Sequence, residues 1–420
     1  PQPRCIAPRY PIQVMLAWGV STNGAAPSVL STVAFLQTDA RRTPMSLSPS
    51  SFAILGAGLM GRLLAVELAR QGHRVEIYDA GSPQAEQSAA TVAAAMLAPL
   101  AESAITEPGV VRMGHYALPR WQQLIASLTE PVFFQQAGTL IVWHRQDAAE
   151  AQRFTRVLEA NQQTTPELPP LQKLDSAALA QAEPTLAERF NHGLYLPGEG
   201  QLDNRQLLTS LLAEMTRLGV QMHWNAPRTP EAFAPGMPGQ PDWVLDCRGL
   251  GARQDWKDLR GVRGEVVRLY APDVTLQRPT RLVHPRYPIY LAPKQDHVFV
   301  IGATEIESDD LSPASVRSTL ELLSAAYAVH PGFAEARILE IRTQCRPTLP
   351  DNLPAIRQPQ PRVLEVNGMY RHGFMISPAM LDVTLEILNT GQSQLSKRFD
   401  LRLELLGQPA PAVQAASALA

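Results

Sequence analysis

Cysteine is scarce in this sequence: Cys5, Cys247 and Cys345 lie far apart and form no Cys-x-x-Cys pair. This spacing excludes a disulfide framework and a cysteine zinc site, and no two histidines have the spacing of metal ligands, so we predict no metal site. Scarce cysteine also fits a reducing cytoplasm, where we expect the protein to work. Nowhere do roughly 18 or more apolar residues follow one another, so we predict no membrane-spanning helix. The formal net charge of −2 gives no reason to expect nucleic acid or an anionic membrane surface as a partner.

The chain is long and apolar enough to bury a large core. Of its 420 residues, 45% are hydrophobic and 18% are charged, and this length predicts two or three folding units. The first 44 residues differ in pattern from the rest of the chain, because their apolar runs are interrupted and follow no period. A signal peptide would contain one compact apolar run, so we do not predict one here. The sequence has no initiating methionine, whereas Met45 stands just before the first convincing strand. We therefore expect residues 1–50 to be a disordered extension and the functional protein to begin near Met45.

A glycine-rich turn between a strand and a helix is the strongest motif in the sequence. Residues 51–55 form an apolar run of strand length, and residues 63–69 carry the apolar pattern of a helix that Gly72 can cap. A second strand, at 74–78, ends in Asp79. The turn itself has a Gly-x-Gly-x-x-Gly pattern, formed by Gly56, Ala57, Gly58, Leu59, Met60 and Gly61.

Each part of this motif has a task in binding a dinucleotide. Gly56 permits the tight turn, Gly58 lets the backbone approach the diphosphate, and Gly61 lets the helix pack closely on the sheet. The diphosphate would rest on the free N–H groups of the helix N-terminus, and Asp79 would accept hydrogen bonds from the ribose. An acidic residue there favours NAD or FAD over NADP but does not separate the first two. A purely structural turn is the alternative.

A run of small residues follows at 88–99. Such a run lets the backbone approach a flat ring closely, although an alanine-rich helix is the alternative that composition allows. The run resembles the segment after the ribose-binding acid in the D-amino-acid oxidase superfamily, especially in its glycine oxidase and sarcosine oxidase branch. The resemblance implies that Ala94, Ala95 and Met96 lie near the isoalloxazine ring of FAD.

Further segments resemble this family in the same order along the chain, between residues 51 and 395. They are similar to a second nucleotide-contacting strand containing Gly249, a substrate-domain hairpin, an arginine–proline segment and a C-terminal flavin loop, at 243–251, 290–305, 343–354 and 368–379. The resemblance implies FAD, and not NAD, as the cofactor. The cysteine that attaches flavin in sarcosine oxidases has no match here, so we expect FAD to be bound non-covalently.

The resemblance also implies which residues meet the substrate. Arg346 would bind a carboxylate, because a guanidinium stays charged and its planar fork matches that group. Tyr290 would add a phenolic hydrogen bond to the same carboxylate, and Arg371 would lie near the amine end. For Tyr290 and Arg371 a structural role stays open, since a lone arginine more often forms a surface ion pair. The residues of the flavin loop that would contact the cofactor are His372, Gly373, Phe374 and Met375.

The implied reaction is oxidation of the C–N bond of a small amino acid or secondary amine. Hydride would pass to flavin N5, the imine would hydrolyse, and oxygen would reoxidise the flavin. One alternative is an FAD-dependent amine dehydrogenase or tRNA-modifying oxidase that uses another acceptor, although the near-neutral charge speaks against tRNA. Another is a flavoprotein subunit that matures a second protein.

The sequence departs from the glycine oxidase pattern where substrate choice is set. Met369 and His372 replace a histidine and an asparagine of the flavin loop, and Arg357 stands in place of a glycine. Cys345 precedes Arg346 where leucine is usual, and we interpret it as a small buried hydrophobe. These departures leave open whether glycine itself is the substrate.

The resemblance implies an α/β fold in which a Rossmann-type FAD-binding domain is interleaved with an α+β substrate domain. The first would contain a mainly parallel sheet and the second a larger mixed or antiparallel sheet, with the active site between them. The sequence leaves open whether the protein forms a homo-oligomer. We expect 51–125, 186–262 and 338–395 to form the FAD-binding domain, 126–185 and 263–337 the substrate domain, and 396–420 a flexible tail.

Overall fold

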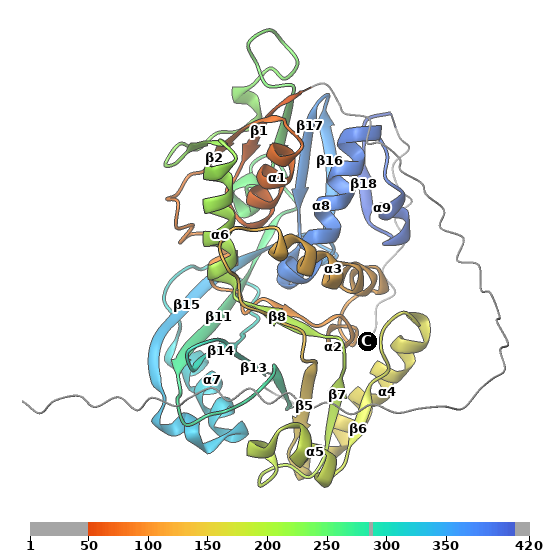
Figure 1. Ribbon diagram of the computed structural model, residues 1–420, viewed down its shortest axis with the longest axis vertical. Helices are drawn as coiled ribbons and strands as arrows, with labels where there is room; N and C mark the ends of the chain where they lie inside the picture. The colour runs from red at the N-terminus through yellow and green to blue at the C-terminus, as the bar shows by residue number, and fades with distance from the viewer. Residues whose placement is uncertain (1–48, 285–288, 408–420) are drawn as a thin grey trace, which may run out of the picture. The chain divides into compact units, whose positions relative to one another are not determined.

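The computed structural model describes residues 49–284 and 289–407 (Figure 1). The expected N-terminal extension therefore lies almost entirely outside the described residues, as does the end of the expected tail from residue 408. Within the described ranges, the strands form two large sheets and one small sheet.

A seven-stranded sheet contains the glycine-rich turn. Its strand order is β18-β16-β17-β10-β1-β2-β9, and every neighbouring pair is parallel except β16 and β17. This mainly parallel arrangement agrees with the expectation for the cofactor domain. In sheet order, the strands are β18 (Arg402–Glu404), β16 (Ala355–Gln360), β17 (Val363–Asn367), β10 (Trp243–Asp246), β1 (Ser51–Leu55), β2 (Arg74–Tyr78) and β9 (Gln221–His223).

Four helices share one hydrophobic core with this sheet. Side chains alternate between the two faces of a strand, so Phe52 and Ile54 of β1 enter this core. Ala53 and Leu55 lie on the opposite face, where Phe233 packs against them. The four helices are α1 (Leu59–Arg70), α3 (Pro108–Ala126), α6 (Asn204–Arg217) and α8 (Gly373–Thr390).

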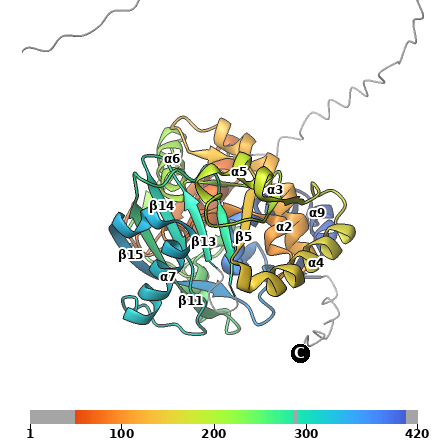
Figure 2. The ribbon, with the colours of Figure 1, turned by 90° about the horizontal axis from the view of Figure 1, so that it is seen from below.

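An eight-stranded mixed sheet carries a second core. Its order is β15-β11-β14-β13-β12-β5-β7-β6, and only β5 and β12 pair in parallel. Helix α7 (Val316–Val329) packs against this sheet (Figure 2), with Leu322 and Ala326 in the shared core. The strands are β15 (Arg337–Thr348), β11 (Arg260–Tyr270), β14 (Val298–Gly302), β13 (Ile289–Pro293), β12 (Thr280–Val283), β5 (Thr139–Trp143), β7 (Gly193–Leu196) and β6 (Gln172–Leu174).

The run of small residues at 88–99 is not a continuous helix. It makes a single 3-10 turn at Ala89–Thr91 and then a short strand, β3 (Met96–Leu97), before α2 begins. β3 pairs with β8 (Gly200–Leu202), which also pairs with β4 (Phe134–Gln135), so this run is anchored to a small antiparallel sheet. The remaining helices are α2 (Pro99–Glu102), α4 (Ala148–Thr164), α5 (Ser176–Ala182) and α9 (Gln394–Arg398).

Some strands lie elsewhere than their expected ranges indicated. β7 and β15 were expected in the cofactor domain, yet both pair within the eight-stranded sheet. Within the expected flexible tail, residues 402–404 form β18, which pairs with β16, because Phe399 and Leu401 are buried in the core and hold the chain there. Strand pairing between distant segments, and not local composition, decides these positions.

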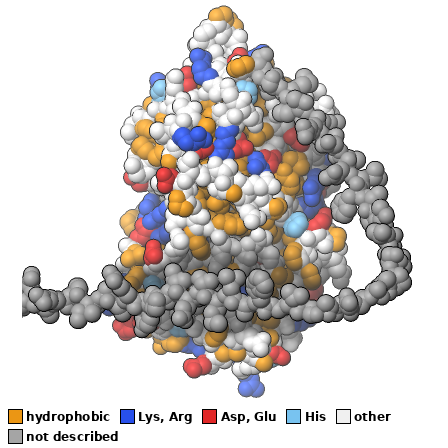
Figure 3. Space-filling view, viewed as in Figure 1, with side chains coloured by type: hydrophobic (Ala, Val, Ile, Leu, Met, Phe, Trp, Pro, Cys, Tyr) orange, Lys and Arg blue, Asp and Glu red, His pale blue; other side chains and the backbone are white. Residues whose placement is uncertain are grey.

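Charged side chains of both signs are interspersed on the face seen in Figure 3. This mixture agrees with the small net charge of the chain. No helix of the described ranges is long and apolar enough to cross a membrane.

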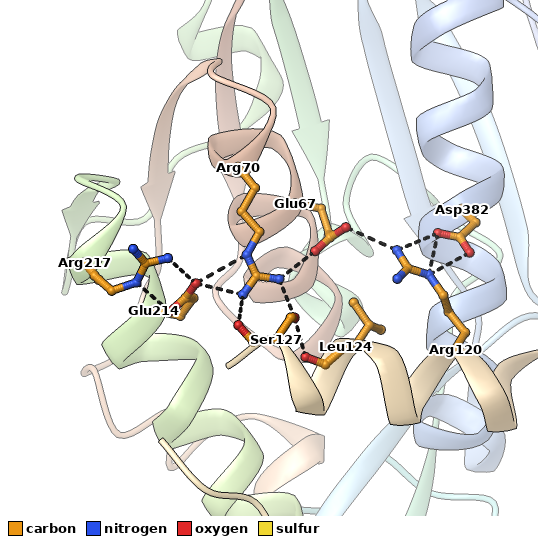
Figure 4. A network of polar contacts seen from close by, with 8 residues as sticks. All are labelled: Glu67, Arg70, Arg120, Leu124, Ser127, Glu214, Arg217 and Asp382. Carbon is orange, nitrogen blue, oxygen red and sulfur yellow. Dashed lines mark hydrogen bonds and ion pairs between the residues drawn. The ribbon is translucent and has the colours of Figure 1, made fainter. Parts of the chain in front are cut away.

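A network of ion pairs ties the four helices of the seven-stranded sheet to one another (Figure 4). Arg70 of α1 binds Glu214 of α6 at 2.7 Å, and Glu67 of α1 binds Arg120 of α3 at 3.1 Å. Arg120 in turn binds Asp382 of α8 at 3.1 Å. Because the Glu214 side chain is fully buried, its loss leaves Arg70 with Glu67 alone and Arg217 without a carboxylate partner among the described residues.

Polar side chains from other elements hold the backbone of the small-residue run. Asn204 donates a hydrogen bond to the carbonyl of Ala90 at 2.7 Å, and Arg205 donates to the carbonyl of Thr91 at 3.3 Å. The run has few polar side chains of its own, so its buried carbonyls need partners from outside.

Lys294, just after β13, makes the third of these contacts. Its ammonium is buried and donates to the carbonyls of Ala94 at 2.8 Å and Leu202 at 2.7 Å, and to Oε1 of Gln201 at 3.0 Å. Burial lowers the pKa of Lys294 to about 7. Three acceptors nevertheless match the three protons of the charged form, whereas a neutral amine would leave one acceptor without a donor.

We expect Glu214→Gln to lower the free energy of unfolding by about 1–2 kcal/mol at neutral pH, since Arg70 and Arg217 both lose a charged partner. Hydrogen bonds from Arg217 and then Arg70 lower the pKa of Glu214 to about 2. A lowered carboxyl pKa stabilises the folded state above its unfolded value and loses that effect as pH falls toward 2. Denaturant unfolding at pH 7 and pH 3 measures the difference, which should shrink at pH 3. Glu150→Gln is the control, because Glu150 pairs with Arg153 on an exposed helix surface. Equal losses of stability in both variants would contradict the role of Glu214 at the helix junction.

We expect Lys294→Met to lower the free energy of unfolding of the apoprotein by about 2–4 kcal/mol, because three buried acceptors lose their donor. Lys257 is exposed, so Lys257→Met is the matched control. Denaturant unfolding of both variants measures the difference. Wild-type stability in Lys294→Met would show that Lys294 does not hold this segment.

Candidate functional site

A single large cavity takes its lining from both large sheets and from the small-residue run. Its volume is 1520 Å³, larger than the roughly 300–1,000 Å³ usual for a pocket that holds one drug-sized ligand. One end lies at the glycine-rich turn, where Gly56, Asp79 and Arg228 line it, and the other at Tyr290 and Arg346. The cavity therefore has room for a dinucleotide and a small second molecule.

Close packing of backbone shapes the first end. Gly56 has φ +89°, and a Cβ on Gly61 would lie 1.9 Å from the carbonyl oxygen of Gly56. Only glycine at both positions lets α1 start this close to β1. Gly58 precedes α1 without a side-chain cap, so the amides of the first helical turn are available to a phosphate.

The acid at the end of β2 is held by the backbone of the turn. Oδ2 of Asp79 accepts a hydrogen bond from the amide of Ala57 at 2.5 Å, and Oδ1 accepts one from Gly81 at 2.7 Å. Arg62 of α1, which is almost fully buried, donates to the carbonyl of Ala57 at 2.7 Å from the other side. Burial lowers the pKa of Arg62 to about 10, so it remains charged at neutral pH. These contacts fit the residues to a dinucleotide with a ribose against Asp79.

The middle of the cavity is lined by the small-residue run and by the start of α8. Ala94, Ala95 and Met96 line it, and Ala95 takes the left-handed conformation with φ +52°. Gly373, the first residue of α8, also lines the cavity, and an added Cβ there would meet nothing within 4 Å. Little side-chain bulk stands between these backbones, which suits a flat ring.

The far end holds a guanidinium without a carboxylate partner. Arg346 of β15 donates only to the carbonyls of Arg263 at 3.2 Å and Thr304 at 3.1 Å, and no described carboxylate lies within ion-pair distance. Gly264 makes room for it, since a Cβ there would lie 2.4 Å from Nη2 of Arg346. Arg346 can therefore bind an anion that enters the cavity.

The hydroxyl of Tyr290 lies at the same end. Desolvation raises the pKa of Tyr290, so the phenol stays protonated and can donate a hydrogen bond. A Cβ on Gly302 would lie 2.7 Å from this hydroxyl, which shows how closely the ring packs on β14.

The guanidinium of Arg371 is bound by two carboxylates. It donates to Oε2 of Glu102 at 2.7 Å and to Oε2 of Glu305 at 2.8 Å. Arg281 of β12 also binds Glu102. Burial would raise the pKa of Glu102, but Arg371 and Arg281 hold it below its usual range, so the carboxylate is ionised. The expectation that Arg371 lies near the substrate amine gains no support from its side chain, which is already paired.

The remaining candidate groups are uncharged. His372 is buried, and desolvation lowers its pKa to about 4, so the imidazole is neutral at pH 7. Burial raises the pKa of Cys345 and of Cys247, so both remain thiols. This agrees with the interpretation of Cys345 as a buried hydrophobe. Among the described residues, no group of three or more His, Cys, Asp and Glu side chains is placed to hold a metal ion.

Nearly all the predicted site residues line this one cavity. The two exceptions are Ala57, whose amide binds Asp79, and Gly61, which packs against Gly56. Glu102, Arg281, Glu305 and Lys294 were not predicted from the sequence. Glu102 is an isolated charge in an otherwise apolar segment, a signal that could have marked it as buried and paired.

Known proteins resemble this chain over most of its length. The sequence profile of the DAO family, described as FAD-dependent oxidoreductases, matches residues 51–384. A Rhizobium etli protein assigned as the thiamine biosynthesis oxidoreductase ThiO is 38% identical over 82% of this chain and 98% of its own length. The glycine oxidase of Geobacillus kaustophilus is 26% identical over 78% of this chain and 89% of its own.

Solved structures agree in fold. The crystal structure of the Geobacillus kaustophilus glycine oxidase has a TM-score of 0.69 at 22% identity, covering 83% of this chain and 96% of that one. The iminodiacetate oxidase of Chelativorans has a TM-score of 0.68 at 23% identity, covering 81% and 96%. Together with the dinucleotide cradle at Gly56 and Asp79, these matches show that the chain belongs to the DAO family of FAD-dependent oxidoreductases.

Proposed function

We propose that the protein oxidises the C–N bond of a small amino acid or secondary amine in the cytoplasm, with oxygen as electron acceptor. One observation carries the proposal: Arg346, a guanidinium with no carboxylate partner among the described residues, lies at the opposite end of the cavity from the dinucleotide cradle. The names of the relatives, ThiO and glycine oxidase, support the same class of substrate.

The chain's own residues would hold FAD without a covalent bond. The first-turn amides of α1 would bind the diphosphate and Asp79 the ribose, and Ala94 to Met96 would lie along the ring. When bound, FAD supplies the hydride acceptor for the substrate carbon. Cys247 and Cys345, the cysteines of the described chain, are held as protonated thiols by raised pKa values, which fits a non-covalent cofactor.

Arg346 and Tyr290 would orient the substrate. The planar fork of Arg346 can receive both oxygens of a carboxylate, and the protonated phenol of Tyr290 can donate a further hydrogen bond. Fixing the carboxylate limits the directions in which the neighbouring C–H bond can point. Small apolar residues, including Val92, Ala94 and Val266, line this part of the cavity and leave little water beside the reacting carbon.

The first test is an absorbance spectrum of the purified protein, followed by anaerobic addition of glycine, sarcosine and D-alanine. We expect a bound flavin whose absorbance is bleached by at least one of them, with peroxide formed when air is admitted. Bleaching without peroxide would favour the alternative of an amine dehydrogenase. A flavin that no amine bleaches would favour the alternative of a partner subunit and contradict our proposal.

We expect Arg346→Ala to raise the dissociation constant of the substrate about 30- to 100-fold, because a charge-assisted pair is lost, while FAD stays bound. Arg346→Lys should recover only part of the affinity, since an ammonium lacks the planar fork. Arg337→Ala is the control, because Arg337 begins the same strand but lies exposed. Anaerobic titration of flavin absorbance measures all three, and unchanged affinity in Arg346→Ala removes Arg346 from this role.

A further inference from the structure

Five charged residues form a continuous cluster at the substrate end of the cavity, which we call the arginine–glutamate cluster. Its members are Arg281, Glu102, Arg371, Glu305 and Arg346. Glu102 binds both Arg281 and Arg371, and Arg371 also binds Glu305. Glu305 follows Thr304, whose carbonyl accepts a hydrogen bond from Arg346 at 3.1 Å.

The charges of this cluster do not cancel. Three guanidiniums carry +3 and two ionised carboxylates carry −2, which leaves +1. His372 beside Glu102 adds nothing, because it is neutral at pH 7. The uncompensated charge belongs to Arg346, which alone in the cluster has only carbonyl partners among the described residues. One substrate carboxylate therefore completes the balance of the cluster, and a second one would meet no unpaired cation among these five residues.

We propose that Glu305 is the specificity-determining residue that restricts this site to substrates with a single carboxylate. The inference rests on the proposed function, because it places the substrate carboxylate at Arg346. Glu305 holds one side of the Arg371 guanidinium at 2.8 Å and accepts a hydrogen bond from the hydroxyl of Tyr370 at 2.5 Å. A second carboxylate that reaches past Arg346 toward Arg371 thus meets a carboxylate that already occupies this guanidinium.

Glu305, unlike Glu102, can be substituted without leaving a buried guanidinium unpaired. Its side chain is 47% exposed at the cavity edge, whereas that of Glu102 is 13% exposed between two arginines. Desolvation would raise the pKa of Glu305, but its contacts with Tyr370 and Arg371 lower it, so the group is ionised at pH 7. When Glu305 loses its charge, Arg371 keeps Glu102, and its Nη1 no longer has an anionic partner, so a second carboxylate can compete for it.

The test compares ligands that differ by one carboxylate in the wild-type holoenzyme and in Glu305→Gln. Sarcosine and iminodiacetate are the substrate pair, and glycolate and malonate are the non-amine pair, whose binding is followed by flavin absorbance. We expect Glu305→Gln to bind malonate about tenfold more tightly and to gain as much in kcat/KM for iminodiacetate, since one repulsive charge is removed. Affinity for glycolate and kcat/KM for sarcosine should change less than about threefold.

Two further variants separate charge from packing. Glu305→Asp keeps the carboxylate and should keep the preference for one carboxylate. Glu307→Gln removes an exposed carboxylate that pairs with Arg260 and does not line the cavity, so it should leave both ratios unchanged. Because Glu305→Asp retains its charge, a preference that it loses to the same extent as Glu305→Gln overturns the proposal.

The outcomes also distinguish this inference from the proposed function. If the wild-type protein binds glycolate and oxidises sarcosine, but the malonate-to-glycolate ratio is the same in Glu305→Gln, the role of Glu305 is overturned alone. If the wild-type flavoprotein binds no monocarboxylate and is bleached by no amine, the proposed function fails and this inference with it.

Discussion

A stretch of backbone with few polar side chains of its own has to be held inside the protein. Residues 88–99 line the cavity largely with alanine, and the carbonyls of Ala90 and Ala94 in this run have hydrogen-bond partners from distant elements. Asn204 and Lys294 reach in from outside to bind the carbonyls of Ala90 and Ala94. The two residues come from α6 and from the end of β13, so holding this run connects the two large sheets.

The small size of the side chains along the cavity wall also explains why the cavity can hold a flat cofactor. At one end, Gly56 and Gly61 let strand and helix approach until no Cβ would fit between them. In the middle, backbone takes the place of side chains on the wall. At the far end, each guanidinium of the arginine–glutamate cluster except Arg346 has a carboxylate partner. The cradle for the dinucleotide and the arginine that can bind a substrate anion thus lie in different parts of one cavity.

Motifs that lie close together in the sequence could be predicted well. The turn at Gly56, the end of α1 near Gly72 and the acid at Asp79 stand where local pattern placed them, and the DAO family and its FAD dependence are confirmed. The roles of Arg346, Tyr290 and the flavin loop, and the domain boundaries, stay predictions. Glu102 and Arg371 could not have been paired in advance, because 269 residues separate them and only the folded sheets bring them together.

The sequence by itself determined the local chemistry: a phosphate cradle, an acid after the second strand, a run of small residues and an arginine in β15. The cradle, the acid and the run of small residues depend on neighbours a few residues away, so periodicity and spacing reveal them, whereas Arg346 was singled out by the resemblance to the family. Only the tertiary structure decided that β7 and β15 join the eight-stranded sheet, that β18 pairs with β16, and which arginine keeps a free charge. Those features depend on pairing between segments that are distant in the sequence. Burial requires that strand edges and charges be paired, but the local sequence does not indicate which segments pair.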